Sequence, residues 1–205
     1  MGALAEIDAV TVDAYGTLVE LRDPVGSLAR RLPEFDRAAI ERAFHAEARH
    51  YVEHSVRGRD EESLARLYAG CTSVFNEALG SSLDSAEYVA ALEEEYAALP
   101  GAAQALARLR AFGLELAVVG NWDRRLEEHL ERLGVAALVS TVVSSAEAGA
   151  AKPDPRPFLL ALERLGVVPE RALHIGDARA DEDGARAAGM RFEPVPLSTL
   201  PERLR

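Results

Sequence analysis

The chain has 205 residues, of which 48% are hydrophobic, and a formal net charge of -11. The hydrophobic content excludes global disorder, and the length suits one domain with a sizeable insertion or two small domains. The acidic balance argues against nucleic-acid binding, no apolar run is long enough to span a bilayer, and a single cysteine, Cys71, fits a reducing cytoplasm. We therefore expect a cytoplasmic protein with neither a nucleic-acid nor a membrane partner, and we leave its oligomeric state open.

The first predicted strand covers residues 6–13, where Ile and Val are frequent, and it ends at Asp13. Strand signals then disappear until about residue 114. Apolar residues recur there at helical spacing, first as Ile40, Phe44, Ala48 and Val52, and then as Leu64, Leu67, Cys71, Val74 and Phe75. Another helix is predicted to start at Asp84 or Ser85 and to carry Val89, Leu92 and Tyr96. Residues 20–98 are thus expected to form a helical bundle without a strand.

From Pro100 onwards, predicted helices and strands alternate. The helices are expected over about 101–112, over about 124–133, from Pro155 to Gly166, and up to Gly189; the strands over 114–119, 141–143, 172–175 and 191–195. Such alternation indicates βαβ units and a parallel sheet. The predicted fold class is α/β: a Rossmann-like doubly wound core, residues 1–19 and 99–205, with an all-helical cap, residues 20–98, inserted after Asp13.

Polar residues follow four of these strands. Asp13, the pair Gly120-Asn121, Lys152 and Asp177 each stand at or after a predicted strand end. Open α/β sheets bind ligands in the crevice beyond the carboxyl ends of their strands. We therefore expect these side chains to meet at one edge of the sheet.

Four segments resemble the ordered motifs of the haloacid dehalogenase-like hydrolase superfamily. They are Asp13-Ala14-Tyr15-Gly16-Thr17, Gly120-Asn121, Lys152-Pro153-Asp154-Pro155 and His174-Ile175-Gly176-Asp177. The resemblance spans about residues 6–192, and the helical insertion takes the place of that family's first type of α-helical cap. It implies that Asp13 is a nucleophile forming a covalent aspartyl intermediate, with Lys152 supplying positive charge.

The resemblance also implies a Mg²⁺ cofactor, which prefers oxygen ligands. Asp13, the backbone carbonyl of Tyr15 and Asp177 would be the protein ligands, and Asp181 would orient metal-bound water. Glu182 and Asp183 are neighbouring alternatives to Asp181. The substrate, a small phosphorylated molecule, would be bound by Thr17, Asn121, Lys152 and the backbone at Gly120.

Two residues depart from the phosphatase pattern of this family. Tyr15 stands where those enzymes have a second aspartate that acts as acid and base, and a phenol with a pKa of ~10 is a proton donor and a poor base at neutral pH. Gly120 stands where they have Ser or Thr, so one phosphate-binding hydroxyl is missing. Both departures predict slow or narrow turnover.

Tyr15 also supports a rival hypothesis, since Asp-x-Tyr-Gly-Thr resembles the metal-independent 2-haloacid dehalogenases. The acidic fourth motif argues against it, and Arg42, Arg49 and Arg57 show no distinctive match to a halide-binding arginine. We favour Mg²⁺-dependent hydrolysis of a phosphate monoester of a small metabolite. A dehalogenase is the alternative, and a weakly catalytic or non-catalytic binding module is a further one.

Other polar residues are expected to have structural roles. His50 and His54 have a metal-pair spacing without a third ligand, so they are assigned to the cap or its surface, and His174 to the core beside the site. The acidic run Glu93-Glu94-Glu95 and the pair Arg124-Arg125 are expected on solvated helix faces. Trp122 is either a pocket wall or a packing anchor, and Asn121 could instead cap the helix that begins near Asp123.

Overall fold

The computed structural model describes residues 6–204. Its main sheet is five-stranded and parallel, in the order β5-β4-β1-β6-β7. The strands are β1 (Ala9–Val12), β4 (Glu115–Gly120), β5 (Thr141–Ser144), β6 (Ala172–Gly176) and β7 (Arg191–Pro194). From the central strand β1 the chain continues to β4 and β5 on one side and later to β6 and β7 on the other, so the sheet is doubly wound. The predicted fold class is confirmed.

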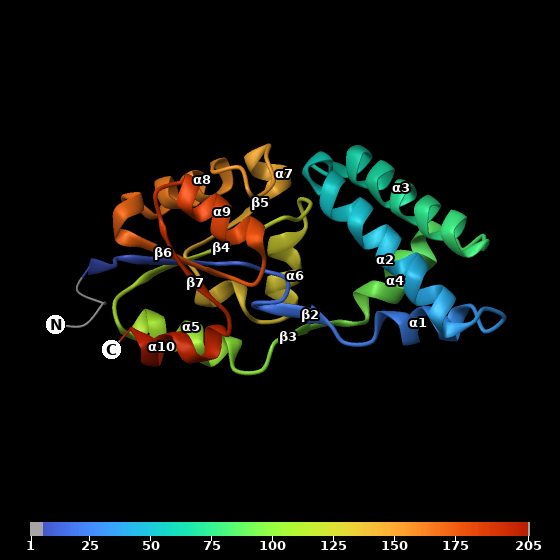
Figure 1. Ribbon diagram of the computed structural model, residues 1–205, viewed down its shortest axis with the longest axis horizontal. Helices are drawn as coiled ribbons and strands as arrows, with labels where there is room; N and C mark the ends of the chain where they lie inside the picture. The colour runs from blue at the N-terminus through green and yellow to red at the C-terminus, as the bar shows by residue number, and fades with distance from the viewer. Residues whose placement is uncertain (1–5, 205) are drawn as a thin grey trace.

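Helices cover both faces of this sheet (Figure 1). They are α5 (Ala102–Ala111), α6 (Leu126–Arg132), α7 (Ser145–Ala148), α8 (Arg156–Leu165), α9 (Arg179–Ala187) and α10 (Leu200–Arg203), with short 3-10 helices η3 (Ala136–Leu138), η4 (Pro169–Arg171) and η5 (Leu197–Thr199). Phe158 of α8 is buried in the core on one face. Leu106 of α5 and Leu126 of α6 are buried on the other face. Each predicted helix of this region is present, shortened by one or a few residues at its ends.

The insertion forms a helical cap beside the core (Figure 1). It consists of α1 (Pro24–Arg31), α2 (Arg37–His54), the 3-10 helix η2 (Ser55–Arg57), α3 (Glu61–Leu79) and α4 (Ser85–Glu93). Its own core includes Leu28, Ile40, Phe75 and Tyr88, all fully or almost fully buried. The cap therefore packs as a hydrophobic unit separate from the sheet.

The prediction that residues 20–98 contain no strand is wrong at both ends of that segment. β2 (Val19–Leu21) pairs antiparallel with β3 (Tyr96–Ala98) where the chain leaves and re-enters the core. Tyr96 was expected in a helix but lies in β3, because α4 ends at Glu93. Strands of three residues are too short for alternation to show in a sequence. The domain limit at 19/20 falls within β2 and the limit at 98/99 directly follows β3; both limits stay a prediction.

The ends of the predicted core, residues 1–5 and 205, lie outside the described residues. Within residues 6–204, no helix combines the length and the apolar character needed to cross a membrane.

Candidate active site

Asp13 leaves the central strand at the carboxyl edge of the sheet. Val12, the last residue of β1, is in register with Val118 of β4 and Ile175 of β6, and the Asp13 backbone N–H donates to the Ile175 carbonyl at 2.9 Å. The turn that follows passes close to Asp177. A Cβ atom at Gly16, whose φ is 81°, would lie 2.3 Å from Asp177 Oδ2. Glycine is therefore required for Asp13 and Asp177 to share this edge.

Lys152 is the buried cation of the site. Its ammonium contacts the carboxylates of Asp13 and Asp181 and donates to the Val119 carbonyl at 3.0 Å. Asn121 holds the lysine's backbone from both sides: its Oδ1 accepts from Lys152 N at 2.7 Å, and its Nδ2 donates to Lys152 O at 3.1 Å. Asn121 thus orients the lysine loop and does not cap α6, whose start carries no side-chain cap.

A buried relay holds Asp181. His174 Nδ1 lies 2.8 Å from the Thr11 hydroxyl, and its Nε2 lies 3.1 Å from Asp181 Oδ1. Burial lowers the pKa of His174, so the ring is neutral: Thr11 donates to Nδ1, and Nε2–H donates to the carboxylate. Burial also acts to raise the pKa of Asp181, but the His174 hydrogen bond and the Lys152 charge together lower it to about 2. The sequence assigned His174 to the core correctly and gave no sign of Thr11.

Asp13 is ionised in the presence of the same neighbouring charges, Lys152 and Asp181. Burial raises its pKa to about 6, and the Lys152 ammonium opposes part of that rise. The pair with Lys152, whose own pKa is raised by these carboxylates, keeps Asp13 a carboxylate at neutral pH. The Thr17 hydroxyl lies 3.5 Å from Asp13 Oδ2. A buried carboxylate with one cation beside it is a suitable nucleophile.

The acidic residues of this edge fit a divalent cation. Ligand oxygens of Asp13, Asp177 and Asp181 all lie within 4.8 Å of one another. Three carboxylates surround the single ammonium of Lys152, which leaves surplus negative charge. The pKa of Asp177 is raised, mainly by burial and in addition by the negative charge of Asp181. Hard oxygen donors with uncompensated charge match the preference of Mg²⁺.

Among the alternatives for the last acidic position, Asp181 is the one that faces the site. Glu182 forms an ion pair with Arg186, and Asp183 forms one with Arg179, both within α9 at the surface. Asp181 is buried, and its Oδ2 accepts the Ala178 backbone N–H at 3.1 Å. One oxygen of Asp181 therefore positions Lys152, and the other accepts a backbone N–H at the start of α9.

Tyr15 borders the site from the solvent side. Its side chain is half-exposed and lines the same cavity as Asp13 and Lys152. Burial of its other half raises the pKa of the phenol, and the Leu21 backbone opposes this only in part. Tyr15 therefore keeps its proton at neutral pH, as expected from the sequence.

Two predicted substrate contacts lie behind the cavity wall. Thr17 and Gly120 are buried and are not among the described residues that line the cavity, whereas Asn121 and Lys152 are. A Cβ atom at Gly120 would lie 3.0 Å from Leu126 Cδ2 and 3.1 Å from Ala14 Cβ. This crowding gives a physical reason for glycine where the family carries Ser or Thr.

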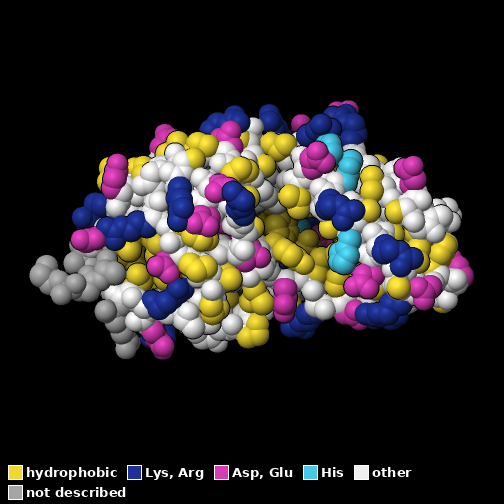
Figure 2. All heavy atoms as spheres, in the orientation of Figure 1, with side chains coloured by type: hydrophobic (Ala, Val, Ile, Leu, Met, Phe, Trp, Pro, Cys, Tyr) yellow, Lys and Arg dark blue, Asp and Glu magenta, His cyan; other side chains and the backbone are white. Residues whose placement is uncertain are grey.

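A cavity of about 500 Å³ extends from Asp13 towards the cap. Figure 2 shows it as a hollow between the two lobes, surrounded by hydrophobic side chains. Its aromatic lining consists of Phe44, Tyr51, Tyr68, Tyr88, Tyr96 and Trp122. Trp122 fulfils both predicted roles, since it lines the cavity and also packs against Tyr96, with ring centroids 5.5 Å apart.

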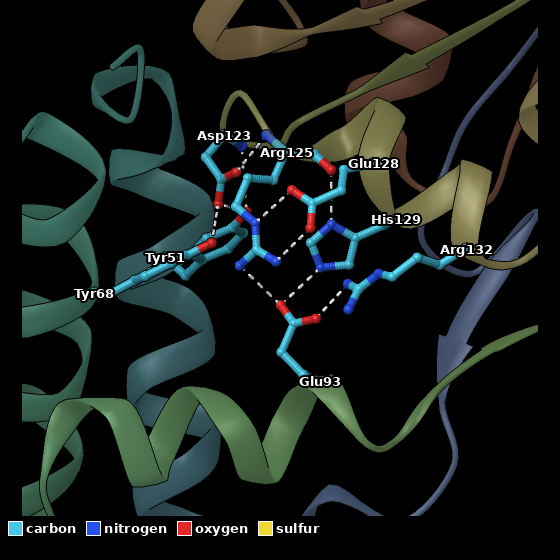
Figure 3. Close-up of polar contacts among 8 residues, drawn as sticks. All are labelled: Tyr51, Tyr68, Glu93, Asp123, Arg125, Glu128, His129 and Arg132. Atoms are coloured by element: carbon cyan, nitrogen blue, oxygen red, sulfur yellow. Dashed lines mark hydrogen bonds and ion pairs between the residues drawn. The ribbon is translucent and has the colours of Figure 1, made fainter. Parts of the chain in front are cut away.

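A polar network joins the cap to the core across this cavity (Figure 3). We call it the cap–core network; its residues are Tyr51, Tyr68 and Glu93 of the cap and Asp123, Arg125, Glu128, His129 and Arg132 of the core. Asp123 Oδ2 accepts from the hydroxyls of Tyr51 and Tyr68, each at 2.9 Å. Glu93 forms ion pairs with Arg125 at 3.1 Å and with Arg132, and a hydrogen bond with His129 at 3.0 Å.

This network corrects two sequence assignments. Glu93 and Arg125 were expected on solvated helix faces, but their side chains are only 18% and 19% exposed. Glu95, 13% exposed, is also covered, and only Glu94 of the acidic run is solvated. Arg124 is exposed as expected. Partners 32 or more residues apart in the chain leave no local pattern for a sequence to show.

His50 and His54 lie in α2 of the cap, as expected. The rings of His50 and His54 stack on each other with centroids 4.1 Å apart. Among residues 6–204, the only acidic, cysteine or histidine group arranged to hold a metal ion is that of Asp13, Asp177 and Asp181.

The doubly wound sheet, the inserted helical cap and the Asp13–Lys152–Asp181 edge define an α/β fold with a charged site at its topological switch point. The model of the haloacid dehalogenase-like hydrolase family matches residues 7–189. The chain belongs to this family, as its motifs indicated.

Curated relatives match part of the chain. Haloacid dehalogenase-like hydrolase domain-containing protein 3 of Mus musculus is 46% identical over 93 residues, which are 45% of this chain and 37% of that protein. Phosphoserine phosphatase of Thermus thermophilus is 39% identical over 138 residues, 63% of this chain and 55% of that protein. The matches thus span about a third to somewhat over half the length of these two relatives.

Solved structures with similar folds include both phosphatases and dehalogenases. A HAD phosphatase from Thermococcus onnurineus has a TM-score of 0.63 at 21% identity, covering 96% of this chain and 97% of its own. L-2-haloacid dehalogenase from Xanthobacter autotrophicus has a TM-score of 0.72 at 22% identity, covering 92% and 77%. At these identities the likeness concerns the fold alone.

Proposed function

We propose that the protein is a Mg²⁺-dependent phosphatase that hydrolyses a phosphate monoester of a small metabolite through a covalent intermediate on Asp13. The observation that carries the proposal is the group of three carboxylates around one lysine. Such surplus negative charge repels a phosphate dianion unless a metal ion is bound, whereas expulsion of halide from a neutral carbon needs no metal. Relatives named as phosphoserine and phosphoglycolate phosphatases add support.

In the first half-reaction, an Asp13 oxygen attacks phosphorus while the bond from phosphorus to the ester oxygen breaks. Lys152 holds Asp13 in place. Its ammonium also neutralises the negative charge that develops on the phosphoryl oxygens. The leaving oxygen takes a proton from the hydroxyl of Tyr15, a residue that lines the same cavity as Asp13 and retains its proton at neutral pH. When bound, Mg²⁺ would be held by Asp13, the Tyr15 backbone carbonyl and Asp177, and would supply positive charge to the phosphate oxygens.

In the second half-reaction, water attacks phosphorus, the bond to the Asp13 oxygen breaks, and the proton of the water must be accepted. The Tyr15 phenolate formed in the first half could accept it. Because Tyr15 is half-exposed and its pKa is raised, solvent returns its proton quickly and removes this base. We therefore expect the first half-reaction to be faster than the second, so that phosphorylated Asp13 accumulates.

A dehalogenase is the second candidate because Tyr15 replaces the acid and base aspartate. Halide is a leaving group that needs no proton, so a tyrosine in this position does no harm to that chemistry. Asp177 favours the phosphatase, since its exposed carboxylate beside those of Asp13 and Asp181 has no part in the displacement of halide.

The test compares both reactions on the same preparation. Phosphate release from a panel of phosphorylated metabolites should require Mg²⁺ and disappear with a chelator, and it should be lost in Asp13→Asn. Release of chloride from 2-chloropropionate without metal would replace the phosphatase by the dehalogenase. If the 205-residue chain forms neither product, the binding module is the remaining explanation.

A further inference from the structure

The cap side of the cavity carries polar groups that the proposed reaction does not use. Glu47 of α2 and Tyr88 of α4 line the same cavity as Asp13, yet their side chains are only 4% and 1% exposed. Among residues 6–204, the Tyr88 hydroxyl is the one buried side-chain polar atom without a hydrogen-bond partner. Buried polar atoms are normally paired, so an unpaired one in the wall of a cavity indicates a position where a ligand group can bind.

Glu47 has no cationic partner among the groups that act on its carboxyl. Burial raises its pKa, and the groups that oppose this rise are the Tyr88 hydroxyl and the Cys71 thiol, with no cation among them. A buried carboxyl group without a cation costs free energy in either protonation state. An ammonium group arriving with a ligand would remove that cost.

The walls around these two residues favour a cation as well. Aromatic rings of Phe44, Tyr51, Tyr68, Tyr96 and Trp122 line the cavity. The faces of such rings attract organic cations, and most strongly where water is excluded. A carboxylate set among aromatic rings selects an ammonium group over a neutral group of the same size, and the hydrophobic hollow in Figure 2 suits an apolar spacer.

We propose that Glu47 and Tyr88 form a subsite for an ammonium group at the non-reacting end of the substrate. The ammonium N–H groups donate to the Glu47 carboxylate and to Tyr88 Oη. Resting on the phosphatase proposal for its other end, the substrate is then a phosphate monoester with an apolar spacer and a terminal amine. The subsite itself can be tested without catalysis.

The binding test uses the fluorescence of Trp122, the only tryptophan of the chain, which lines the cavity. The wild-type protein is titrated with 2-phenylethylammonium and with 2-phenylethanol. We expect the amine to bind about tenfold more tightly than the alcohol, and Glu47→Gln to remove this preference. Glu41→Gln, the same exchange at an exposed position of α2, should retain it. Equal affinity for amine and alcohol, or an unchanged preference in Glu47→Gln, would overturn the subsite.

Circular dichroism checks that each variant is folded. If Glu47→Gln fails to fold, Tyr88→Phe takes its place, since it removes only the unpaired hydroxyl. Tyr88→Phe should bind the amine more weakly than the wild type does, and undiminished amine binding in it would count against the proposal.

The kinetic test separates this inference from the proposed function. 4-(Aminomethyl)benzyl phosphate and 4-(hydroxymethyl)benzyl phosphate differ only in the charge of one end, and the amine should have a kcat/KM about tenfold higher in the wild type and equal to that of the alcohol in Glu47→Gln. If p-nitrophenyl phosphate and both esters are cleaved, and the amine and alcohol esters have equal kcat/KM in the wild type, the subsite is overturned and the phosphatase proposal is retained. Selective binding of the amine without cleavage of any ester overturns the phosphatase and leaves the subsite standing.

Discussion

The two ends of the cavity differ in how their polar groups are partnered. At the sheet edge, Lys152 contacts two carboxylates, and Asp181 in turn is held by His174 and Thr11. On the cap side, within residues 6–204, no cation acts on Glu47 and the Tyr88 hydroxyl has no hydrogen-bond partner. A fully paired network is rigid before substrate arrives, whereas unpaired groups gain most when a ligand binds. Under the two proposals, the core carries the chemistry and the cap carries the recognition of the substrate.

The largest expected effect concerns the proposed nucleophile, Asp13. Asp13→Asn keeps the shape of the side chain but removes the attacking carboxylate, so steady-state phosphate release should fall by at least about 10³-fold. Asp183→Asn, on the surface of α9, is the matched control and should keep wild-type rates. A phosphate-release assay with Mg²⁺ checks both, and an Asp13→Asn protein with wild-type turnover would rule out Asp13 as nucleophile.

The next effect concerns the acid and base position. Tyr15→Asp supplies a carboxylate that can accept the proton of water, so steady-state turnover should rise by about 10²-fold. Rapid-quench kinetics should show a burst of alcohol product in the wild type, from accumulation of phosphorylated Asp13, and no burst in Tyr15→Asp. Wild-type kinetics without a burst, together with no gain in Tyr15→Asp, would show that Tyr15 does not limit the second half-reaction.

A smaller effect concerns the cap–core network. Burial acts to raise the pKa of Glu93, but its bonds with His129 and Arg132 and the Arg125 charge lower it from 4.5 to about 2. Because the folded-state pKa lies below the unfolded one, Glu93 stabilises the fold fully above pH 4.5 and loses this contribution as the pH falls towards 2. Glu93→Gln should lower the free energy of unfolding by about 1–3 kcal/mol at neutral pH and flatten its fall in that acid range.

Urea denaturation at a series of pH values measures this effect. Glu94→Gln is the matched control, since Glu94 is the next residue, is 59% exposed and pairs only with Arg31 within the cap. It should follow the wild-type profile. An identical acid profile for Glu93→Gln and the wild type would show that the ion pairs of Glu93 do not stabilise the fold.

The smallest effects compare one hydroxyl from each end of the cavity. Thr11→Val removes a paired hydroxyl and leaves His174 Nδ1 without a partner, which should cost about 1–2 kcal/mol. Tyr88→Phe removes a hydroxyl that has no partner, so ligand-free stability should be unchanged or rise by about 0.5 kcal/mol. Urea denaturation of both variants measures the difference. Equal losses in the two would contradict the contrast between the two ends.

Much of the fold could be predicted because its signals are local. Strand β6 and helix α2 follow from hydrophobic spacing within a few residues, and Gly80 ends α3 in the left-handed conformation where the sequence indicated a stop. Strands β2 and β3 could not be predicted, because three residues carry no period and each strand is stabilised by the other. In the site, the residues at strand ends were predicted, but the residues that hold them in place were not. The sequence left open whether Asn121 belongs to the site or caps a helix, and only its hydrogen bonds to the Lys152 backbone decide this.

The sequence by itself determined the family, the doubly wound sheet and the convergence of Asp13, Lys152 and Asp177 on one edge, since strand ends in a parallel sheet must meet there. It also determined that a phenol, Tyr15, stands two residues after Asp13. Only the tertiary structure decided that Glu93 and Arg125 join cap to core, that Thr11 and His174 hold Asp181, and that Glu47 and Tyr88 line the cavity with no cation among the groups that act on Glu47. Burial and pairing depend on partners distant in the chain, and these set the electrostatics on which both the chemistry and the recognition depend.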